Sequence, residues 1–346
     1  MAARLQAAAP VLLLGLLLAA IVAVAAVLPP STQRIVTDSM VVLIAVIGTY
    51  TFVGNSGILS FGHIGFMAIG AYVSAWLTIP PMTKKLLLPG LPEFLMQAHW
   101  DTVSATIAAG AVAALVALIF GLPLMRLSGI AASIGTFTLL AIVQSVAGNW
   151  KDMTGGQGSL FGLPASTNMY VALAWALVAL LAAFLYQNTR SGFRLNASRE
   201  DEVAARAVGV NVGRERLTAF VLSAFMVGVA GALHAHFLGV IVASSYFLGL
   251  TFVSLAMLVI GGINSLSGAV IGVVVVSVLG ELLRRVEGGF DLGGMAVPAL
   301  PGLREVGLAA AMLLILVFRP AGLTRGREIA WPLRSGARNE SGDGKA

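Results

Sequence analysis

The chain has 346 residues, of which 58% are hydrophobic and 10% are charged, and its mean hydropathy is +0.94. About a quarter of the residues in a soluble domain are charged, so this composition excludes a soluble multidomain protein and predicts an all-α protein that crosses a membrane many times. The absence of cysteine excludes disulfides and thiolate metal sites. The formal net charge of +6 comes from basic residues without interleaved aromatics, so we expect contact with membrane lipid and none with nucleic acid.

Ten apolar segments are expected to be membrane-spanning helices. The first, 11–28, follows Arg4 and ends at Pro29 and Pro30, so a signal peptide is the alternative. Because its apolar run is longer than that of most signal peptides, we favour a retained span. The other nine segments are 40–54, 58–79, 102–125, 130–148, 169–186, 217–239, 246–262, 266–283 and 305–318.

A strongly charged stretch, 187–216, interrupts the apolar chain, and a second basic region follows the last segment. Cytoplasmic loops are enriched in Lys and Arg, so we expect both regions in the cytoplasm. The number of intervening segments then places both termini in the cytoplasm. This arrangement leaves Lys84, Lys85 and the pair Arg284–Arg285 on the outer face, against the positive-inside rule.

The sequence predicts a single membrane domain, 1–330, followed by a disordered cytoplasmic tail, 331–346. With the topology above, segments two to five and seven to ten run in opposite directions, as the halves of an inverted repeat would. Small residues four positions apart, such as Gly231 and Ala235, favour close packing of these helices in lipid.

Within the stretch 187–216, the sequence predicts one amphipathic helix from Ser198 to Gly209. Ser198 is a suitable N-cap with Asp201 three residues later, and Gly209 is a suitable C-terminal cap. The apolar face would consist of Val203, Ala204, Ala207 and Val208, and the residues pointing away from it would be Arg199, Glu202 and Arg206. A helix of about ten residues is marginal alone in water, so we infer that a soluble partner protein stabilises it and moves the membrane domain through it.

A run of glycine and polar residues, 54–66, lies between the second and third segments. Polar groups at membrane depth are costly unless they face a partner or a watery cavity. We interpret the run as part of a substrate path. Its residues are Asn55, Ser56, Ser60, Gly62, His63 and Phe66. The alternative is that these groups bond across a helix interface, which is the preferred interpretation for His63 considered alone.

Residues 54–57 also have the G-x-S-G form of rhomboid intramembrane serine proteases, in which a histidine on another helix activates the serine. The histidines that could activate Ser56, His234 and His236, belong to a distant segment. We keep the protease as an alternative and assign no catalytic residue. The four histidines lack the spacing of metal ligands, so no metal site is expected.

The sequence has no G-x-x-x-x-G-K-[ST] motif, so we expect no ATP binding through a P-loop and no enzymatic activity in this chain. The centres of the predicted segments also lack the relay of ionisable residues that proton- or sodium-coupled carriers usually need. A transporter without such a relay is expected to take energy from a partner, and a secondary carrier is the alternative. Glu281 is interpreted as an i, i+4 partner of Arg285 at the outer interface.

The run 57–72 resembles the S-x-G-H-x-x-F-x-x-x-G-A-Y signature of LivM-type permeases of branched-chain amino-acid ABC importers. The stretch 199–212 and the segment after it are similar to that family's cytoplasmic loop and following span. The resemblance covers 39–322, although Ile64-Gly65 departs from the small residues expected after the histidine. It implies a type II-importer-like permease of about ten transmembrane helices in the bacterial inner membrane.

The resemblance also implies partners. These are a second related permease, two ATP-binding subunits that bind the ATP, and a periplasmic substrate-binding protein, with no cofactor in this chain. It implies inward transport of Leu, Ile and Val, whereas related permeases transport urea, short amides or aromatic acids.

In ABC importers generally, an E-A-A-x-x-x-G motif forms the coupling helix that docks on the ATPase. Val203-Ala204-Ala205 and Gly209 have that spacing, with Val203 where the glutamate would be and Glu202 beside it. The residues expected to couple to the ATPase are Arg199, Glu200, Glu202, Val203, Ala204, Ala205, Arg206 and Gly209.

Overall fold

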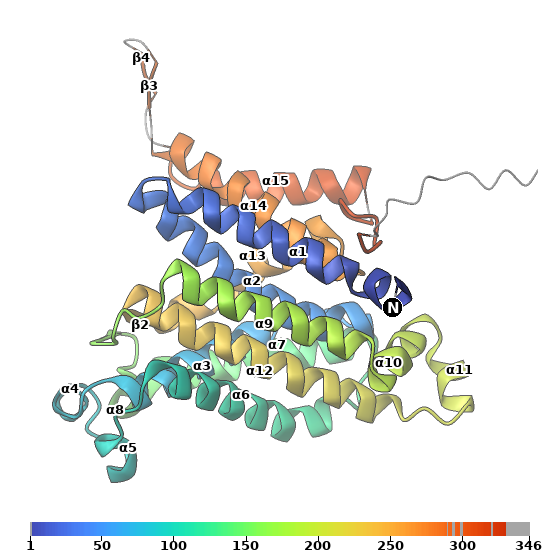
Figure 1. The fold of residues 1–346 in the computed structure, drawn as a ribbon. Helices are drawn as coiled ribbons and strands as arrows, with labels where there is room; N and C mark the ends of the chain where they lie inside the picture. The colour runs from blue at the N-terminus through green and yellow to red at the C-terminus, as the bar shows by residue number, and fades with distance from the viewer. Residues whose placement is uncertain (1, 289, 293–294, 298–299, 320, 330–346) are drawn as a thin grey trace, which may run out of the picture.

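The computed structural model describes residues 2–288, 290–292, 295–297, 300–319 and 321–329. The tail that we expected to be disordered, 331–346, lies outside the described residues. All ten predicted segments are helices, arranged as a bundle with nearly parallel or antiparallel axes (Figure 1). They are α1 (Ala2–Ala26), α2 (Pro30–Ser56), α3 (His63–Thr78), α6 (Thr102–Leu124), α7 (Gly129–Asn149), α9 (Met169–Gln187), α12 (Val212–Leu238), α13 (Leu248–Gly261), α14 (Leu266–Glu287) and α15 (Leu303–Phe318).

Within the described residues, eight segments are long and apolar enough to cross a membrane, α13 being counted together with the 3₁₀ turn before it. The helices α3 and α15, with 16 residues each, are shorter. The third predicted segment starts five residues too early, because residues 58–62 are not helical and α3 begins at His63. The all-α, polytopic membrane fold predicted from the composition is confirmed.

Short elements connect the long helices. These are α4 (Pro81–Leu87), α5 (Glu93–Gln97), α8 (Lys151–Thr154), β1 (Ser159–Phe161), α10 (Arg190–Glu200), α11 (Glu202–Ala207), β2 (Val240–Val242), the 3₁₀ helix η1 (Ala243–Tyr246), β3 (Phe290–Leu292) and β4 (Met295–Val297). The strands β1 and β2 pair antiparallel, as do β3 and β4.

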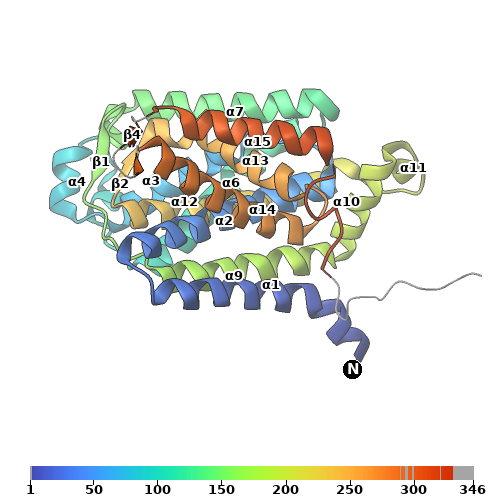
Figure 2. The same ribbon diagram turned by 90° about the horizontal axis from the view of Figure 1, so that it is seen from above.

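The two ends of the bundle carry different elements. Both views place α10, α11 and the N-terminus at one end, and α4 and β2 at the other, where β1 pairs with β2 (Figures 1 and 2). The turn between α13 and α14 belongs to the first end, because Asn264 there accepts a hydrogen bond from Arg199 of α10. The relative positions of these loops match the alternation of segments predicted from the sequence.

The most buried spans, α2 and α12, have the same position in the two halves of the predicted repeat. Each has 27 residues and ends at a glycine in the left-handed region, Gly57 with φ 71° and Gly239 with φ 72°. A stretch without helix follows α2, and β2 and the 3₁₀ helix η1 follow α12. The shorter helices α3 and α13 come next, and α2 and α12 run in opposite directions (Figure 1). This arrangement is consistent with the inverted repeat predicted from the topology.

Close backbone contacts hold the centre of the bundle together. A Cβ atom on Gly231 of α12 would lie 1.9 Å from the carbonyl oxygen of Met67 in α3, and one on Gly70 of α3 would lie 2.0 Å from that of Gly228. Any side chain at these positions would separate α3 from α12. Small residues therefore act here as they do between membrane helices, by letting two backbones touch.

Candidate functional site

His63 fastens the start of α3 to α12. Its Nδ1 lies 2.7 Å from the hydroxyl of Ser60, and its Nε2 lies 2.5 Å from the hydroxyl of Ser223 in α12. The ring packs against three phenylalanines, Phe52, Phe66 and Phe220. Both ring nitrogens therefore have partners inside the protein, as the helix-packing interpretation of His63 expects.

The residues assigned to the substrate path separate into two groups. Asn55 and Ser56 lie at the end of α2, where the Asn55 side-chain oxygen accepts a hydrogen bond from Asn196 of α10. Ser60 and His63 bond to each other instead. All six predicted path residues are buried in this conformation. Their role in a path stays a prediction, and it requires the surrounding helices to move apart.

The hydrogen bonds of Ser56 and the histidines differ from those of an intramembrane serine protease. The Ser56 hydroxyl accepts a hydrogen bond from the backbone N–H of Ile58. His234 bonds to the Tyr246 hydroxyl, and His236 bonds to the Ser74 hydroxyl and to a backbone carbonyl. The serine–histidine pair that the protease alternative needs is therefore not formed among the described residues.

The charged stretch contains two helices instead of the one predicted from Ser198 to Gly209. Ser198 lies inside α10, and its hydroxyl donates to the carbonyl oxygen of Leu195, so the N-cap prediction for Ser198 is wrong. Asp201 breaks the helix with φ −149° and caps α11, where its side chain accepts from the N–H groups of Val203 and Ala204. Gly209, with φ 86°, follows the end of α11 as predicted.

The short helix α11 exposes apolar residues at the end of the bundle. Val203 is 78% exposed and Val208 is 81% exposed. Ala204 and Ala207 are exposed as well, whereas Ala205 is buried against the protein. An apolar surface on a helix of six residues is what a site of contact with another protein would present.

Glu202 joins α11 to α12 and does not reach outward. Its carboxylate accepts from Arg216 at 2.7 Å and from Arg206 at 2.5 Å. Burial alone would raise the pKa of Glu202, but the hydrogen bonds from Arg216 and Arg206 outweigh burial and hold the pKa below its ordinary value. Glu202 is therefore engaged within this chain and lies beside the exposed surface of α11.

The Arg199 side chain points into the protein, which corrects the prediction that it points away. Its guanidinium donates to the carbonyl oxygen of Gly54 at 2.7 Å, to Asn264 at 3.2 Å and to Glu200 at 2.8 Å. Glu200 remains largely exposed. Arg199 thus connects α10 with the end of α2 and with the turn between α13 and α14.

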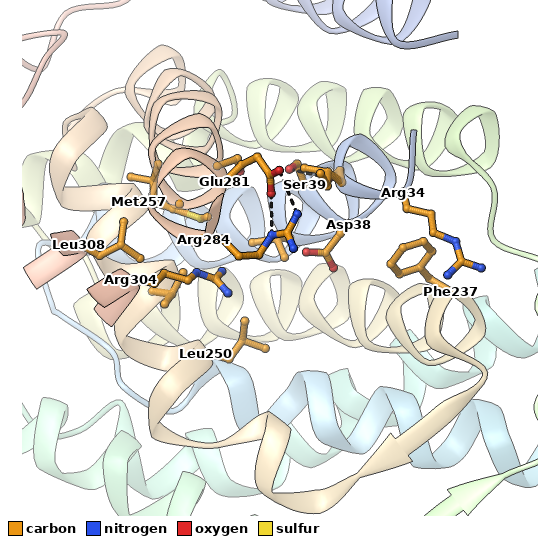
Figure 3. A pocket seen from close by; sticks show the side chains of 16 residues that line it. Arg34, Asp38, Ser39, Phe237, Leu250, Met257, Glu281, Arg284, Arg304 and Leu308 are labelled. Atoms are coloured by element: carbon orange, nitrogen blue, oxygen red, sulfur yellow. Dashed lines mark hydrogen bonds and ion pairs between the residues drawn. The ribbon is translucent and has the colours of Figure 1, made fainter. Parts of the chain in front are cut away.

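A charged cavity of about 290 Å³ lies between α2, α13, α14 and α15 (Figure 3). Its charged lining residues are Arg34 and Asp38 of α2, Glu281 and Arg284 of α14, and Arg304 of α15. Glu281 bonds to Arg284 and also to Arg285, which confirms the predicted i, i+4 pair. The Asp38 carboxylate lies 3.7 Å from Nε2 of His234.

Sequence reasoning missed this cavity. It began the second span at residue 40 and so left Asp38 outside the membrane, whereas α2 begins at Pro30. Two features could have identified it, namely Arg34 and Asp38 one turn apart after a proline start, and the arginines of α14 on the side where the positive-inside rule expects few.

A bundle of membrane-spanning helices with buried polar clusters, a charged cavity and an exposed short helix at one end is typical of the class of polytopic transport permeases. Residues 31–317 match the sequence model of the family described as branched-chain amino acid transport system / permease component, and the chain belongs to this family.

Named relatives agree with this assignment. The chain is 28% identical over 340 residues to the high-affinity branched-chain amino acid transport system permease protein LivM of Escherichia coli K12, covering 88% of this chain and 73% of the relative. It is 28% identical over 323 residues to LivM of Salmonella typhimurium LT2, covering 84% of this chain and 69% of the relative. It is also 29% identical over 245 residues to the permease protein LivH of the latter organism, covering 66% and 77%.

Proposed function

We propose that the protein is one permease subunit of an ABC importer that carries Leu, Ile and Val across the bacterial inner membrane toward the cytoplasm. The observation that supports this most is the family match over residues 31–317, with relatives whose names give branched-chain amino acids as the transported class. The end of the bundle that carries α10 and α11 is assigned to the cytoplasm, because the arginines of 187–216 are there.

The proposed partners are a second, related permease, two ATP-binding subunits and a periplasmic substrate-binding protein. The match to both LivM and LivH relatives supports a related permease as partner. The exposed Val203 on α11 and the exposed Val208 directly after it support docking of an ATP-binding subunit at this helix. ATP then binds to the partner subunits, and this chain needs no cofactor of its own.

The proposed mechanism is alternating access. Closure of the ATP-binding subunits moves α11, and Arg199 transmits the movement of α10 to α2 and to the α13–α14 turn. Such a shift requires α11 to make different contacts with the open and closed states of its partner. The buried cluster around His63 then opens toward the substrate path.

The test is transport by the assembled complex. The chain is reconstituted in liposomes with the four partner subunits, and uptake of labelled L-leucine is measured with and without ATP on the side of α11. We expect leucine uptake to require ATP. Excess isoleucine or valine should reduce the uptake, and excess urea should not. Leucine uptake that a proton or sodium gradient drives without ATP would overturn the proposal in favour of a secondary carrier.

A further inference from the structure

The cavity beside Asp38 presents unpaired charges of both signs. Within it, Glu281 is held by two arginines, Arg284 and Arg285. Among the described residues, the Arg304 guanidinium has no carboxylate within ion-pair distance, although it lies within electrostatic reach of Asp38. With Glu281 neutralised, the lining keeps one acid, Asp38, and two bases, Arg34 one turn before it on α2 and Arg304 on the wall formed by α15 (Figure 3).

The rest of the wall is apolar. Its aliphatic side chains are Val42, Leu250, Val253, Met257, Val276 and Leu308. The volume of about 290 Å³ is close to ~300 Å³, the lower limit of the range for ligand pockets, so the cavity suits a small molecule. Gly280 keeps the space beside Arg304 open, since a Cβ there would come within 3.7 Å of the arginine Nε.

We propose that this cavity binds the α-amino-acid zwitterion, with the ammonium on Asp38, the carboxylate on Arg304 and the aliphatic side chain on the apolar wall. This inference rests on the proposed function. The cavity lies toward the end of the bundle opposite α10 and α11, where the amino acid arrives first, because its charged lining belongs to the first turns of α2 and α15 and the last turns of α14, whereas the other end of α2 contacts α10. Neither a simple cation nor a simple anion suits it, because each would meet an uncompensated charge of its own sign.

The proposal also explains two departures from the usual pattern of a membrane helix. Ionisable residues inside spans are expensive and mark substrate sites when they face a cavity, as Asp38 does. The arginines of α14 and α15 lie at the end of the bundle opposite α10 and α11, where the positive-inside rule expects few basic residues. Recognition of a carboxylate gives Arg304 a function there, because a guanidinium matches a carboxylate with two parallel hydrogen bonds.

The experiment measures binding of labelled L-leucine to the purified full-length chain in phosphatidylglycerol nanodiscs. The competitors are 4-methylpentanoate, which lacks the ammonium, and L-leucinamide, which lacks the carboxylate. In the unmodified chain, L-leucine should compete about tenfold or more better than either analogue, because each loses one charge-assisted hydrogen-bonded contact.

Two variants should each remove one of these two preferences. Asp38→Asn should abolish the preference for leucine over 4-methylpentanoate and keep that over leucinamide, and Arg304→Gln should do the reverse. Gly280→Leu, which fills the cavity without removing a charge, should abolish binding. Lys85→Gln, an exposed charge at the same end of the bundle, is the control. Thermal unfolding of each variant checks that it is folded.

The outcomes separate this inference from the proposed function. If the unmodified chain does not bind leucine, or if folded Asp38→Asn and Arg304→Gln keep both preferences, the inference is wrong, while ATP-dependent leucine uptake by the assembled complex would still support the function. Displacement of leucine by ethanolamine phosphate as readily as by leucine would assign the cavity to a lipid headgroup and overturn the inference. Absence of leucine uptake by the complex would refute the proposed function itself.

Discussion

Arg199 of α10 donates a hydrogen bond to the carbonyl oxygen of Gly54 at the end of α2, over 2.7 Å. The aliphatic part of the same side chain lies against Gly57, where a Cβ atom would come within 2.5 Å of its Cγ. The guanidinium also reaches Asn264 in the turn between α13 and α14. One side chain therefore links the segment before the exposed helix α11 both to α2 and to the turn between α13 and α14.

The first prediction concerns this link. Arg199→Ala should lower ATP-dependent leucine uptake by about tenfold or more. Hydrogen bonds to a charged group contribute roughly 1.5–3 kcal/mol each. Without those of Arg199, a movement of α10 is no longer transmitted to Gly54 and Asn264. The measurement is the uptake rate at equal amounts of reconstituted complex. ATP hydrolysis should persist, so that the ratio of ATP consumed to leucine transported rises.

Arg190→Ala, which removes an exposed arginine at the start of α10, serves as the matched control. If both variants have the same ratio of ATP consumed to leucine transported, then the positive charge of the stretch matters for coupling and the contact with Gly54 does not.

The second prediction concerns Gly209, whose φ of 86° only glycine adopts readily. A Cβ there would meet no atom within 4 Å, so the cost of Gly209→Leu is backbone strain of about 1–2 kcal/mol and not a steric clash. We expect this variant to insert normally and to hydrolyse ATP with reduced uptake. Gly209→Asn should recover much of the uptake, because asparagine tolerates the left-handed region. Normal uptake by Gly209→Leu would contradict a coupling role.

The extent to which sequence reasoning succeeded follows from the physics of each feature. All ten helices were located, because the cost of burying a backbone in lipid makes long apolar runs decisive. The polar run 54–66 was also identified. The sequence did not predict that Asn55 bonds to α10 while His63 bonds to α12. Those contacts join residues far apart in the chain, and no local pattern encodes them.

Side-chain direction in the charged stretch was the weakest part of the prediction. The predicted apolar face was based on one continuous helix, whereas the chain breaks at Asp201 and α11 is rotated relative to α10. Arg199 consequently turns inward and Glu202 turns toward Arg216. Asp38 was missed for a different reason, since a single charge near the end of a span lowers its local hydropathy and shifts the expected boundary past it.

The third prediction is a pH dependence of the α11–α12 junction. The pKa of Glu202 is below the ordinary 4.5, because its arginine partners outweigh burial. A carboxyl group with a lowered folded pKa adds stability that is complete above the unfolded pKa and is lost as the pH falls through the folded pKa. We therefore expect α11 to stay anchored above about pH 5 and to loosen in more acidic solution.

Because the chain has no cysteine, Ala207→Cys provides a unique site for a fluorophore on α11. Its anisotropy should fall as the solution is acidified, and the same label combined with Glu202→Gln should show low anisotropy at every pH. An anisotropy that does not change in acid would contradict the anchoring role of Glu202.

The fourth prediction concerns the contact between α3 and α12. Gly231→Leu should prevent stable folding, because its Cβ would lie 1.9 Å from the carbonyl oxygen of Met67, and overpacking of a tight core typically costs about 1–3 kcal/mol or more. Thermal unfolding of the purified chain in detergent measures this. Gly249→Ala, at a position where a Cβ meets no atom within 4 Å, should leave the unfolding temperature unchanged or slightly raised. Similar unfolding temperatures for both variants would rule out a close α3–α12 interface.

The fifth prediction concerns the hydrogen bonds of His63. His63→Ala removes the contacts that join Ser60 and Ser223, and Ser60→Ala removes one of them. Alternating access requires α3 and α12 to separate where the substrate passes, so weakening this junction should change the KM and the maximal rate of leucine uptake by severalfold. His99→Ala, which alters an exposed histidine near the opposite end, should leave both unchanged. The decisive comparison is between the two buried variants. If both transport leucine with unaltered kinetics while folding normally, this junction does not open during transport, and the path must pass between other helices.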